Sequence, residues 1–307
     1  NSMFRVYSVT KLLVSTAIFQ LIGKGNISLE AEISNYLDSL PEPWQEIKVR
    51  HLLSHASGLP DFMQLDHNLP DDEILEILRN TEMEFTPGTR FSYNQTGYWL
   101  LAQIIEKTSG HSLEKFITDN QFNGDREGIV FSSNSFQAIP NRVSKYIYNS
   151  KNKSFYRSDD NLGRRGLACN GLAITLDKMV KWNTSFDANR FISDGTKKLM
   201  WMPFDYKVKN LPFLHGWADY SNDSVVSYGF TGGAVCAFRK FAGKNLTVIL
   251  LSNGYKYIPV HNTIVNTVSG IVDNSLINRQ NLLEQELMSA FLNGNMEKAV
   301  AKYLEIK

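Results

Sequence analysis

Residues 4–22 read FRVYSVTKLLVSTAIFQLI, and the rest of the fold can be placed around this segment. From Val9 to Ile22 the residues are mostly apolar or small, and neither Pro nor Gly interrupts them. Such a run predicts a buried helix. Gly23 and Gly25 follow it and end the helix. Ser8 therefore stands at the point where the chain enters the helix.

Ser8-Val9-Thr10-Lys11 forms an S-x-x-K pattern at this helix start. Residues three apart share one face of a helix, so the Ser8 hydroxyl and the Lys11 amine can meet. A lysine packed among apolar groups loses part of its preference for the charged form and can act as a base. A serine at a helix start also keeps its backbone N–H free as a donor to an oxyanion. The pattern is short and frequent, so its meaning depends on the rest of the chain.

The remaining sequence alternates helical and extended patterns. Helices are predicted over 71–79, 98–107 and 177–182, and residues 47–55 indicate a strand start followed by a short helix. Strands are predicted over 224–228, 234–241 and 246–251, the last two joined as a hairpin through 242–245. A helical pattern returns over 280–306 and is split by Gly294.

Residues 120–165 are less regular and rich in Asn, Ser and Lys, which indicates an insert of loops and short strands. Aromatic side chains within this insert fit either a cover over a substrate cleft or a minor core. These are Phe136, Tyr146, Tyr148, Phe155 and Tyr156.

Composition narrows the classes of function. The 307 residues are 43% hydrophobic, which is enough for one sizeable core, and 32 basic residues nearly balance 31 acidic ones. Nothing in this balance predicts a nucleic-acid partner, and no apolar run reaches the roughly 18 residues of a membrane span. The two cysteines, Cys169 and Cys236, are expected to be free and buried. His51 and His55 lie four apart, as two metal ligands on one face of a helix would, but no Glu follows His51 as in an H-E-x-x-H pattern.

Several segments, in this order, resemble the class C β-lactamase-like family, which includes D-amino-acid-specific peptidases and carboxylesterases. The resemblance covers residues 3 to about 255. It is carried by FRVYSVTK (4–11), IKVRHLLSHASGLPDF (47–62), TPGTRFSYNQTGYWLLAQIIEKTSG (86–110), Asn170-Gly171-Leu172 with Asp177 and Trp182, and YGFTGG (228–233).

The resemblance implies an α+β fold of the β-lactamase/transpeptidase type. An antiparallel sheet is flanked by helices, a mainly helical second region lies against it, and Ser8 sits in the cleft between them. We expect a hydrolase domain over 1–270 and a helical tail over 271–307. Since the nucleophile segment begins within a few residues of Asn1, we also expect that N-terminal strands and a leader are missing. Relatives of this type imply a periplasmic or other extracytoplasmic location.

The resemblance also implies site roles. Ser8 would be the nucleophile, Lys11 would help to take its proton, and Tyr93 would be a second general acid or base. The backbone N–H groups of Ser8 and Gly233 would form the oxyanion hole. Thr231 and Gly232, in the third family motif, would contact substrate. No metal or organic cofactor is implied.

Two positions depart from the family pattern. The second motif is usually Tyr-x-Asn, and here Gln95 supplies the amide with one methylene more, while Asn94 would face the other way. The third motif usually begins with Lys or His, and here Phe230 stands there, unable to attract a carboxylate. The sequence thus predicts a serine hydrolase acting on an ester or amide of a small or peptide-like substrate, with true β-lactamase activity disfavoured. The alternative is a catalytically impaired binding protein on the same scaffold.

Overall fold

The computed structural model describes residues 1–207, 213–222, 225–255, 260–277, 283, 286–287, 290 and 294–306. The α-helices are α1 Thr10–Gly23, α2 Glu42–Gln45, α3 Val49–Leu53, α4 Asp71–Arg79, α5 Thr96–Ser109, α6 Leu113–Gln121, α7 Leu167–Asn170, α8 Leu176–Asp187, α9 Asp194–Met200, α10 Val260–Val272 and α12 Met296–Ile306. The 3₁₀ helices are η1 Tyr7–Val9, η2 Ile33–Asn35, η3 Phe62–Gln64, η4 Arg164–Gly166 and η5 Asn274–Leu276. The strands are β1 Phe4–Arg5, β2 Ile129–Phe131, β3 Tyr146–Asn149, β4 Ser154–Arg157, β5 Leu172–Ile174, β6 Ala218–Asp219, β7 Ser227–Gly232, β8 Cys236–Phe241, β9 Leu246–Leu251 and β10 Gly254–Tyr255.

The largest sheet is antiparallel, with the strand order β6-β7-β8-β9. Strand β8 is buried along its whole length, and its side chains alternate between two cores. Cys236 and Phe238 belong to the main core, whereas Ala237 and Phe241 join a smaller core with Val265 of α10. This alternation follows from the two-residue period of a strand. The sheet is therefore covered on both faces.

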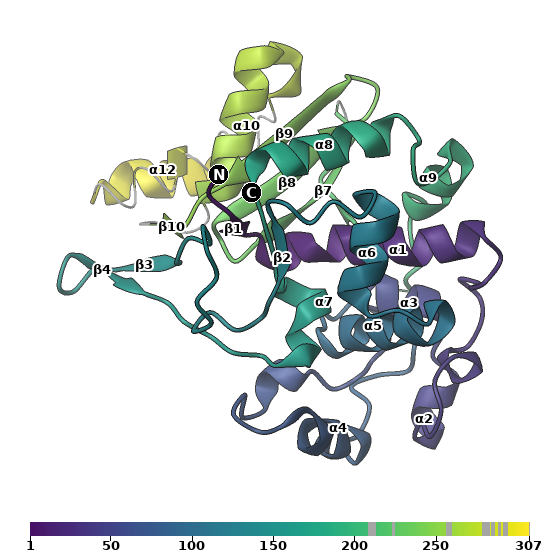
Figure 1. Ribbon diagram of the computed structural model, residues 1–307. Helices are drawn as coiled ribbons and strands as arrows, with labels where there is room; N and C mark the ends of the chain where they lie inside the picture. The colour runs from purple at the N-terminus through teal and green to yellow at the C-terminus, as the bar shows by residue number, and fades with distance from the viewer. Residues whose placement is uncertain are drawn as a thin grey trace.

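Helix α1 runs through the centre of the molecule, between the four-stranded sheet and the helices α5, α6 and α7 (Figure 1). It is buried from Thr10 to Leu21 because partners surround it on every side. Most of its residues are apolar, as a helix buried all round requires. The prediction of a buried helix here is confirmed.

Two smaller sheets hold the chain around α1. Strand β1 pairs with β5, which also pairs with β2, all antiparallel. This pairing fixes the chain just before η1 and so fixes Ser8. The second small sheet joins β10 to the hairpin β3–β4, which projects from the body of the molecule in Figure 1. Within the hairpin, the Tyr148 and Phe155 rings pack edge to face with centroids 5.2 Å apart.

The predicted α+β class, with an antiparallel sheet, flanking helices and a helical region, is confirmed. Helix α4 has the predicted bounds, and the hairpin of β8 and β9 turns where expected. The first turn of α4 carries three carboxylates and its last turn carries Arg79, charges that interact favourably with the helix dipole. The limit predicted at residue 270 between a hydrolase domain and a tail stays a prediction.

One strand was misplaced by the sequence pattern. The strand predicted over 224–228 lies at Ser227–Gly232, so the third family motif is part of β7 itself. The glycines of this segment have a weak strand propensity of their own, and the pairing with β8 overrides it. Ser224 lies outside the described residues, as do 280–282, 284–285, 288–289 and 291–293 of the predicted 280–306 helix. Helices α6, α9 and α10 were not predicted.

Among the residues that the structure describes, no helix combines the length and apolar character needed to span a bilayer.

Candidate active site

Ser8 lies in a tight turn between β1 and α1, within the 3₁₀ helix η1. The residue before it, Tyr7, has φ of +48°, a left-handed conformation that is uncommon for a bulky side chain. The turn is held because the Val6 N–H donates to the Leu172 carbonyl at 2.9 Å, and the Leu172 N–H donates to the Thr10 hydroxyl at 3.2 Å. A strained backbone fixed in this way often marks a functional residue.

Tyr93 is the hydrogen-bond partner of Ser8. Its hydroxyl donates to Ser8 Oγ over 2.9 Å, although 85 residues separate the two in sequence. The next residue, Asn94, points into the protein, where its Nδ2 donates to the Leu59 carbonyl and its Oδ1 accepts from the Gly97 N–H. Asn94 therefore anchors the start of α5 and is not available to the cleft. The expectation that it faces the other way agrees with this geometry.

Lys11 is fully buried, and its contacts differ from those expected of the S-x-x-K spacing. Its Nζ donates to Gln95 Oε1 at 2.7 Å and to the Cys169 carbonyl at 3.1 Å. It also lies 5.0 Å from the Tyr93 ring centroid. Among the described residues, no hydrogen bond joins Lys11 to Ser8. The helix spacing places the two on one side, but the tertiary partners of Lys11 turn its ammonium toward Gln95.

Gln95 thus occupies the place of the family's third-position amide and reaches the lysine despite the longer side chain. Its backbone N–H donates to Asp61 Oδ2 at 3.1 Å, and its carbonyl accepts from the Cys169 thiol. These bonds fix the backbone of Gln95, so the extra methylene is taken up by the side chain. Lys11 stays within hydrogen-bond distance of the amide as a result.

The end of β7 packs directly on the turn that carries Ser8. A Cβ added at Gly232 would lie 2.0 Å from the Val6 carbonyl oxygen and 3.2 Å from the Ser8 nitrogen. Gly233 has φ of +54°, and a Cβ there would lie 2.6 Å from Cγ of Tyr7. Both positions therefore require glycine. Among the described residues, the backbone N–H groups of Ser8 and Gly233 donate to no protein acceptor, which leaves two donors close together.

Aromatic rings line the site on the sheet side. Phe230 is buried, with its ring centroid 6.2 Å from that of Tyr93 and 5.6 Å from that of Phe213. The Lys11 ammonium lies 5.9 Å from the Phe230 ring. Thr231, the next residue of β7, is partly exposed and pairs with Ala237 of β8. The motif therefore presents an apolar ring beside Tyr93.

Two residues near the site were not assigned a role in it from the sequence. His55 is buried with its ring 4.4 Å from that of Tyr93, and its Nδ1 accepts the Asn94 N–H at 3.1 Å. Burial and the Lys11 charge hold the pKa of His55 well below its usual value, so this ring is neutral. Asp61 accepts the Gln95 N–H, and burial raises its pKa. Both lie in SHASGLPD, so their place in that quoted segment was the available signal.

The other candidates lie in structural positions. His51 Nδ1 accepts the Lys48 N–H at 3.1 Å, and burial lowers its pKa to about 4. His51 Nδ1 thus accepts from the backbone of Lys48, and His55 Nδ1 accepts from the backbone of Asn94, so each imidazole has its own backbone partner. Over the described part of the chain, no group of three or more His, Cys, Asp or Glu side chains could hold a metal ion. Cys169 and Cys236 are free and buried, as expected.

Comparison with known proteins places this chain in a family. The family model described as Beta-lactamase matches residues 1–263. Penicillin-binding protein 4* of Bacillus subtilis (strain 168) is 34% identical over 159 residues, which cover 48% of this chain and 34% of that protein. Penicillin-binding protein 4 of Amycolatopsis lactamdurans is 24% identical over 283 residues, covering 83% and 73%. A D-aminopeptidase of Gluconobacter oxydans (strain 621H) is 25% identical over 270 residues, covering 82% and 50%.

The chain thus spans between about a third and three quarters of the length of these curated relatives. Among solved structures, the D-amino acid amidase of Ochrobactrum anthropi SV3 in complex with L-phenylalanine amide superposes with a TM-score of 0.75 at 19% identity, covering 90% of this chain and 86% of that one. The octameric penicillin-binding protein homologue of Pyrococcus abyssi gives 0.74 at 22% identity, covering 94% and 70%. These likenesses show the shared fold. Since the family model matches most of its residues, the chain belongs to the beta-lactamase family.

Proposed function

We propose that this protein is a serine hydrolase that cleaves an ester or amide through an acyl-serine intermediate on Ser8. The observation that carries the proposal is the 2.9 Å hydrogen bond between Tyr93 Oη and Ser8 Oγ. It joins a strained turn to Tyr93, a residue that is 39% exposed, and Ser8 itself is partly exposed. A nucleophile within hydrogen-bond reach of an acid or base is the arrangement that covalent catalysis needs.

In the acylation step, Ser8 Oγ attacks the carbonyl carbon and its proton passes to Tyr93 in the phenolate form. The N–H groups of Ser8 and Gly233 would stabilise the oxyanion that develops on the carbonyl oxygen. Tyr93 then donates the proton to the leaving alkoxide or amine as the carbon–heteroatom bond breaks. Water attacks the acyl-serine in the second step, with Tyr93 taking its proton and returning one to Ser8.

Lys11 would act in this scheme through its charge. Its ammonium lies 5.0 Å from the Tyr93 ring centroid, close enough to attract the negative charge that moves between Ser8, Tyr93 and the substrate during the reaction. Gln95 Oε1 and the Cys169 carbonyl hold that ammonium in place, and the neutral His55 ring behind Tyr93 adds no competing charge. We therefore treat Lys11 and Tyr93 as one proton-transfer unit.

The substrate class follows from the sheet side of the site. Phe230 and Phe213 offer apolar rings where a cation would bind the carboxylate of a penicillin or a peptide end. We propose that small esters and amides are cleaved in preference to penicillins. The names D-aminopeptidase and D-amino acid amidase among the relatives support an amide or ester reaction.

The test uses a fluorophosphonate probe and 4-nitrophenyl butyrate. The folded protein should be labelled once and should release nitrophenol, and Ser8→Ala should abolish both. Ser150→Ala, at an exposed position in the turn between β3 and β4, is the matched control and should keep wild-type labelling and turnover. If folded wild-type protein is neither labelled nor active, the hydrolase proposal is wrong, and a binding protein on the same scaffold takes its place.

We further propose that the protein acts outside the cytoplasm, in the periplasm or at the cell surface. The penicillin-binding proteins among its relatives support this location. Fractionation of cells that produce the native gene product with an epitope tag would test it. Recovery of all the tagged protein with cytoplasmic markers would contradict the proposal.

A further inference from the structure

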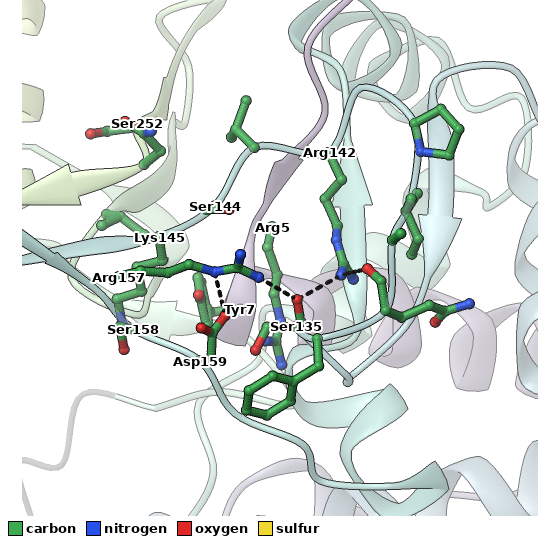
Figure 2. A pocket seen from close by; sticks show the side chains of 18 residues that line it. Arg5, Tyr7, Ser135, Arg142, Ser144, Lys145, Arg157, Ser158, Asp159 and Ser252 are labelled. Atoms are coloured by element: carbon green, nitrogen blue, oxygen red, sulfur yellow. Dashed lines mark hydrogen bonds and ion pairs between the residues drawn. The ribbon is translucent and has the colours of Figure 1, made fainter.

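A cavity of about 510 Å³ lies beside the turn that carries Ser8. Its walls come from three parts of the chain that are distant in sequence: Arg5 and Tyr7, the segments 135–145 and 157–159, and residues Val235, Ser252 and Asn253. Figure 2 shows these side chains gathered around the opening. None of them belongs to the proton-transfer unit of the proposed hydrolase.

The charges around this cavity do not balance. Four cations line it, and two of them are neutralised, because Arg5 pairs with Asp160 and Arg157 pairs with Asp159. The remaining two, Arg142 and Lys145, make no ion pair with a carboxylate among the described residues. Burial raises the pKa of Tyr7 to about 12, so its hydroxyl supplies no compensating negative charge.

Arg142 is held by backbone oxygens. Its Nη2 donates to the carbonyls of Asn134, Ser135 and Gln137, and Ser135 also accepts from Arg157 at 3.0 Å (Figure 2). Its other terminal nitrogen, Nη1, is buried and has no hydrogen-bond partner in the described part of the chain. The backbone bonds therefore hold the guanidinium charge in the cavity wall without a carboxylate partner among the described residues.

Lys145 is held over aromatic rings. Its Nζ lies 4.6 Å from the Tyr7 ring centroid and 5.9 Å from that of Tyr255. Partial burial lowers the pKa of this lysine, because the ammonium has lost part of its hydration. Ring contacts replace only part of that loss. An anion in the cavity would restore a counter-charge to Lys145.

The cavity borders the candidate active site at Tyr7, whose side chain lines it. This residue precedes Ser8 directly, and its ring is the group that a Cβ on Gly233 would strike. One residue thus separates the cavity wall from the candidate nucleophile and from the proposed oxyanion donors. A substrate held at Ser8 would therefore lie next to this wall of the cavity.

We propose that this cavity binds a carboxylate on the acyl portion of the substrate, through Lys145 and Arg142. The inference rests on the proposed hydrolase function and names its substrate class, esters or amides of acids with a second, anionic end. Phe230 removes a cation from the third motif, and the cavity supplies two cations on another side of Ser8. The acidic end would enter between Lys145 and the loop around Arg142.

The test compares 4-nitrophenyl monoesters of adipic and suberic acid with the hexanoate and octanoate of the same chain lengths. We expect kcat/KM to be about tenfold higher for each acidic ester, as one partly buried charge pair supplies. This ratio should fall about tenfold in Lys145→Met and be kept in Lys145→Arg. Lys151→Met, an exposed lysine in the turn between β3 and β4, should leave the ratio unchanged. Melting temperatures of the three variants report whether each is folded.

The outcomes separate the two proposals. Turnover of neutral esters with no acidic preference would overturn this inference and leave the hydrolase proposal standing. An equal loss in Lys151→Met would also overturn it, because general surface charge would then explain the ratio. If neither kind of ester is cleaved, the hydrolase proposal fails, and calorimetry with free adipate then tests the cavity by itself. Adipate binding that Lys145→Met weakens about tenfold supports a carboxylate site, whereas no adipate binding refutes it.

Free anions provide a last arm of the test. Inorganic phosphate could inhibit as strongly as adipate, with the same dependence on Lys145, while the protein shows no preference for acidic esters. The cavity would then be a site for a free anion. That result would overturn the assignment of the cavity to the substrate.

Discussion

Replacement of Gly232 by alanine should separate the two proposed oxyanion donors. The new Cβ would lie 2.0 Å from the Val6 carbonyl oxygen, whereas ordinary van der Waals contact begins at 3.4 Å. The obstructing atoms belong to the backbone, so no side chain can rotate away. Strand β7 and the η1 turn must therefore move apart by about 1.4 Å. This displacement falls directly between Ser8 and Gly233.

A misplacement of about 1 Å in a catalytic constellation can cost about 100-fold in rate. For Gly232→Ala we expect kcat/KM for 4-nitrophenyl butyrate to fall by about that factor, which equals about 2.7 kcal/mol of transition-state stabilisation. The assay is initial-rate kinetics on folded protein, with the melting temperature measured in parallel. Labelling of Ser8 by the fluorophosphonate should slow by a similar factor.

Two other glycines provide controls. A Cβ at Gly195, in α9, would meet only the Ser193 hydroxyl at 3.8 Å, so Gly195→Ala should keep full activity. A Cβ at Gly229, in the same strand as Gly232, would strike the Phe238 carbonyl at 1.9 Å, so Gly229→Ala reports the cost of a similar collision against β8. Wild-type kcat/KM in Gly232→Ala would refute the reasoning, as would an equal loss of activity in Gly195→Ala.

Three further predictions follow from buried groups. Gln95→Leu removes the oxygen that accepts a hydrogen bond from the buried Lys11 ammonium at 2.7 Å, so the free energy of unfolding should fall by about 1–3 kcal/mol. Urea denaturation measures this change, and unchanged stability would contradict the prediction. Burial lowers the pKa values of His51 and His215 from 6.5 to about 4, so the unfolded chain binds protons at a higher pH than the folded one, and stability should fall as the pH drops from 6.5 toward 4. Denaturation at pH 7.5 and at pH 5.0 measures this loss of stability, which His51→Gln should reduce. Higher stability at pH 5.0 than at pH 7.5 would refute the prediction. Burial raises the pKa of Cys169 to about 12, so it should resist a thiol reagent in the folded protein and react in denaturant, and prompt labelling of the native state would count against the packing described.

The sequence predicted those parts of the fold that depend on neighbours along the chain. The apolar run after Ser8 could only be a helix buried on all sides, and α4 carries its own amphipathic and charge pattern. The hairpin of β8 and β9 has strands joined by a short turn. Helix α10 was missed, although it is apolar and lacks Pro. Its place on β8 and β9 is a tertiary contact, which no local period reports.

For the candidate site, the family segments indicated Ser8, Tyr93 and Gly233, but not their contacts. Lys11 was expected beside the Ser8 hydroxyl from helix spacing alone, and the structure gives it Gln95, 84 residues away, as a partner. Spacing along a helix fixes which face a side chain shares. The position of its charged end depends on which acceptors the folded chain brings near it.

The cavity with Lys145 and Arg142 shows the same division more sharply. In the sequence, Arg142, Lys145 and Arg157 look like ordinary surface charges, and none of them lies in a quoted motif. Folding brings residues 5–7, 135–145, 157–159 and 252–253 together around the cavity. In this arrangement two of the four cations pair with carboxylates and the other two do not. Sequence alone therefore established the family, the central helix and the candidate nucleophile. Tertiary structure alone established which charges lie beside it without a partner, because electrostatic pairing depends on distance in space and not on order along the chain.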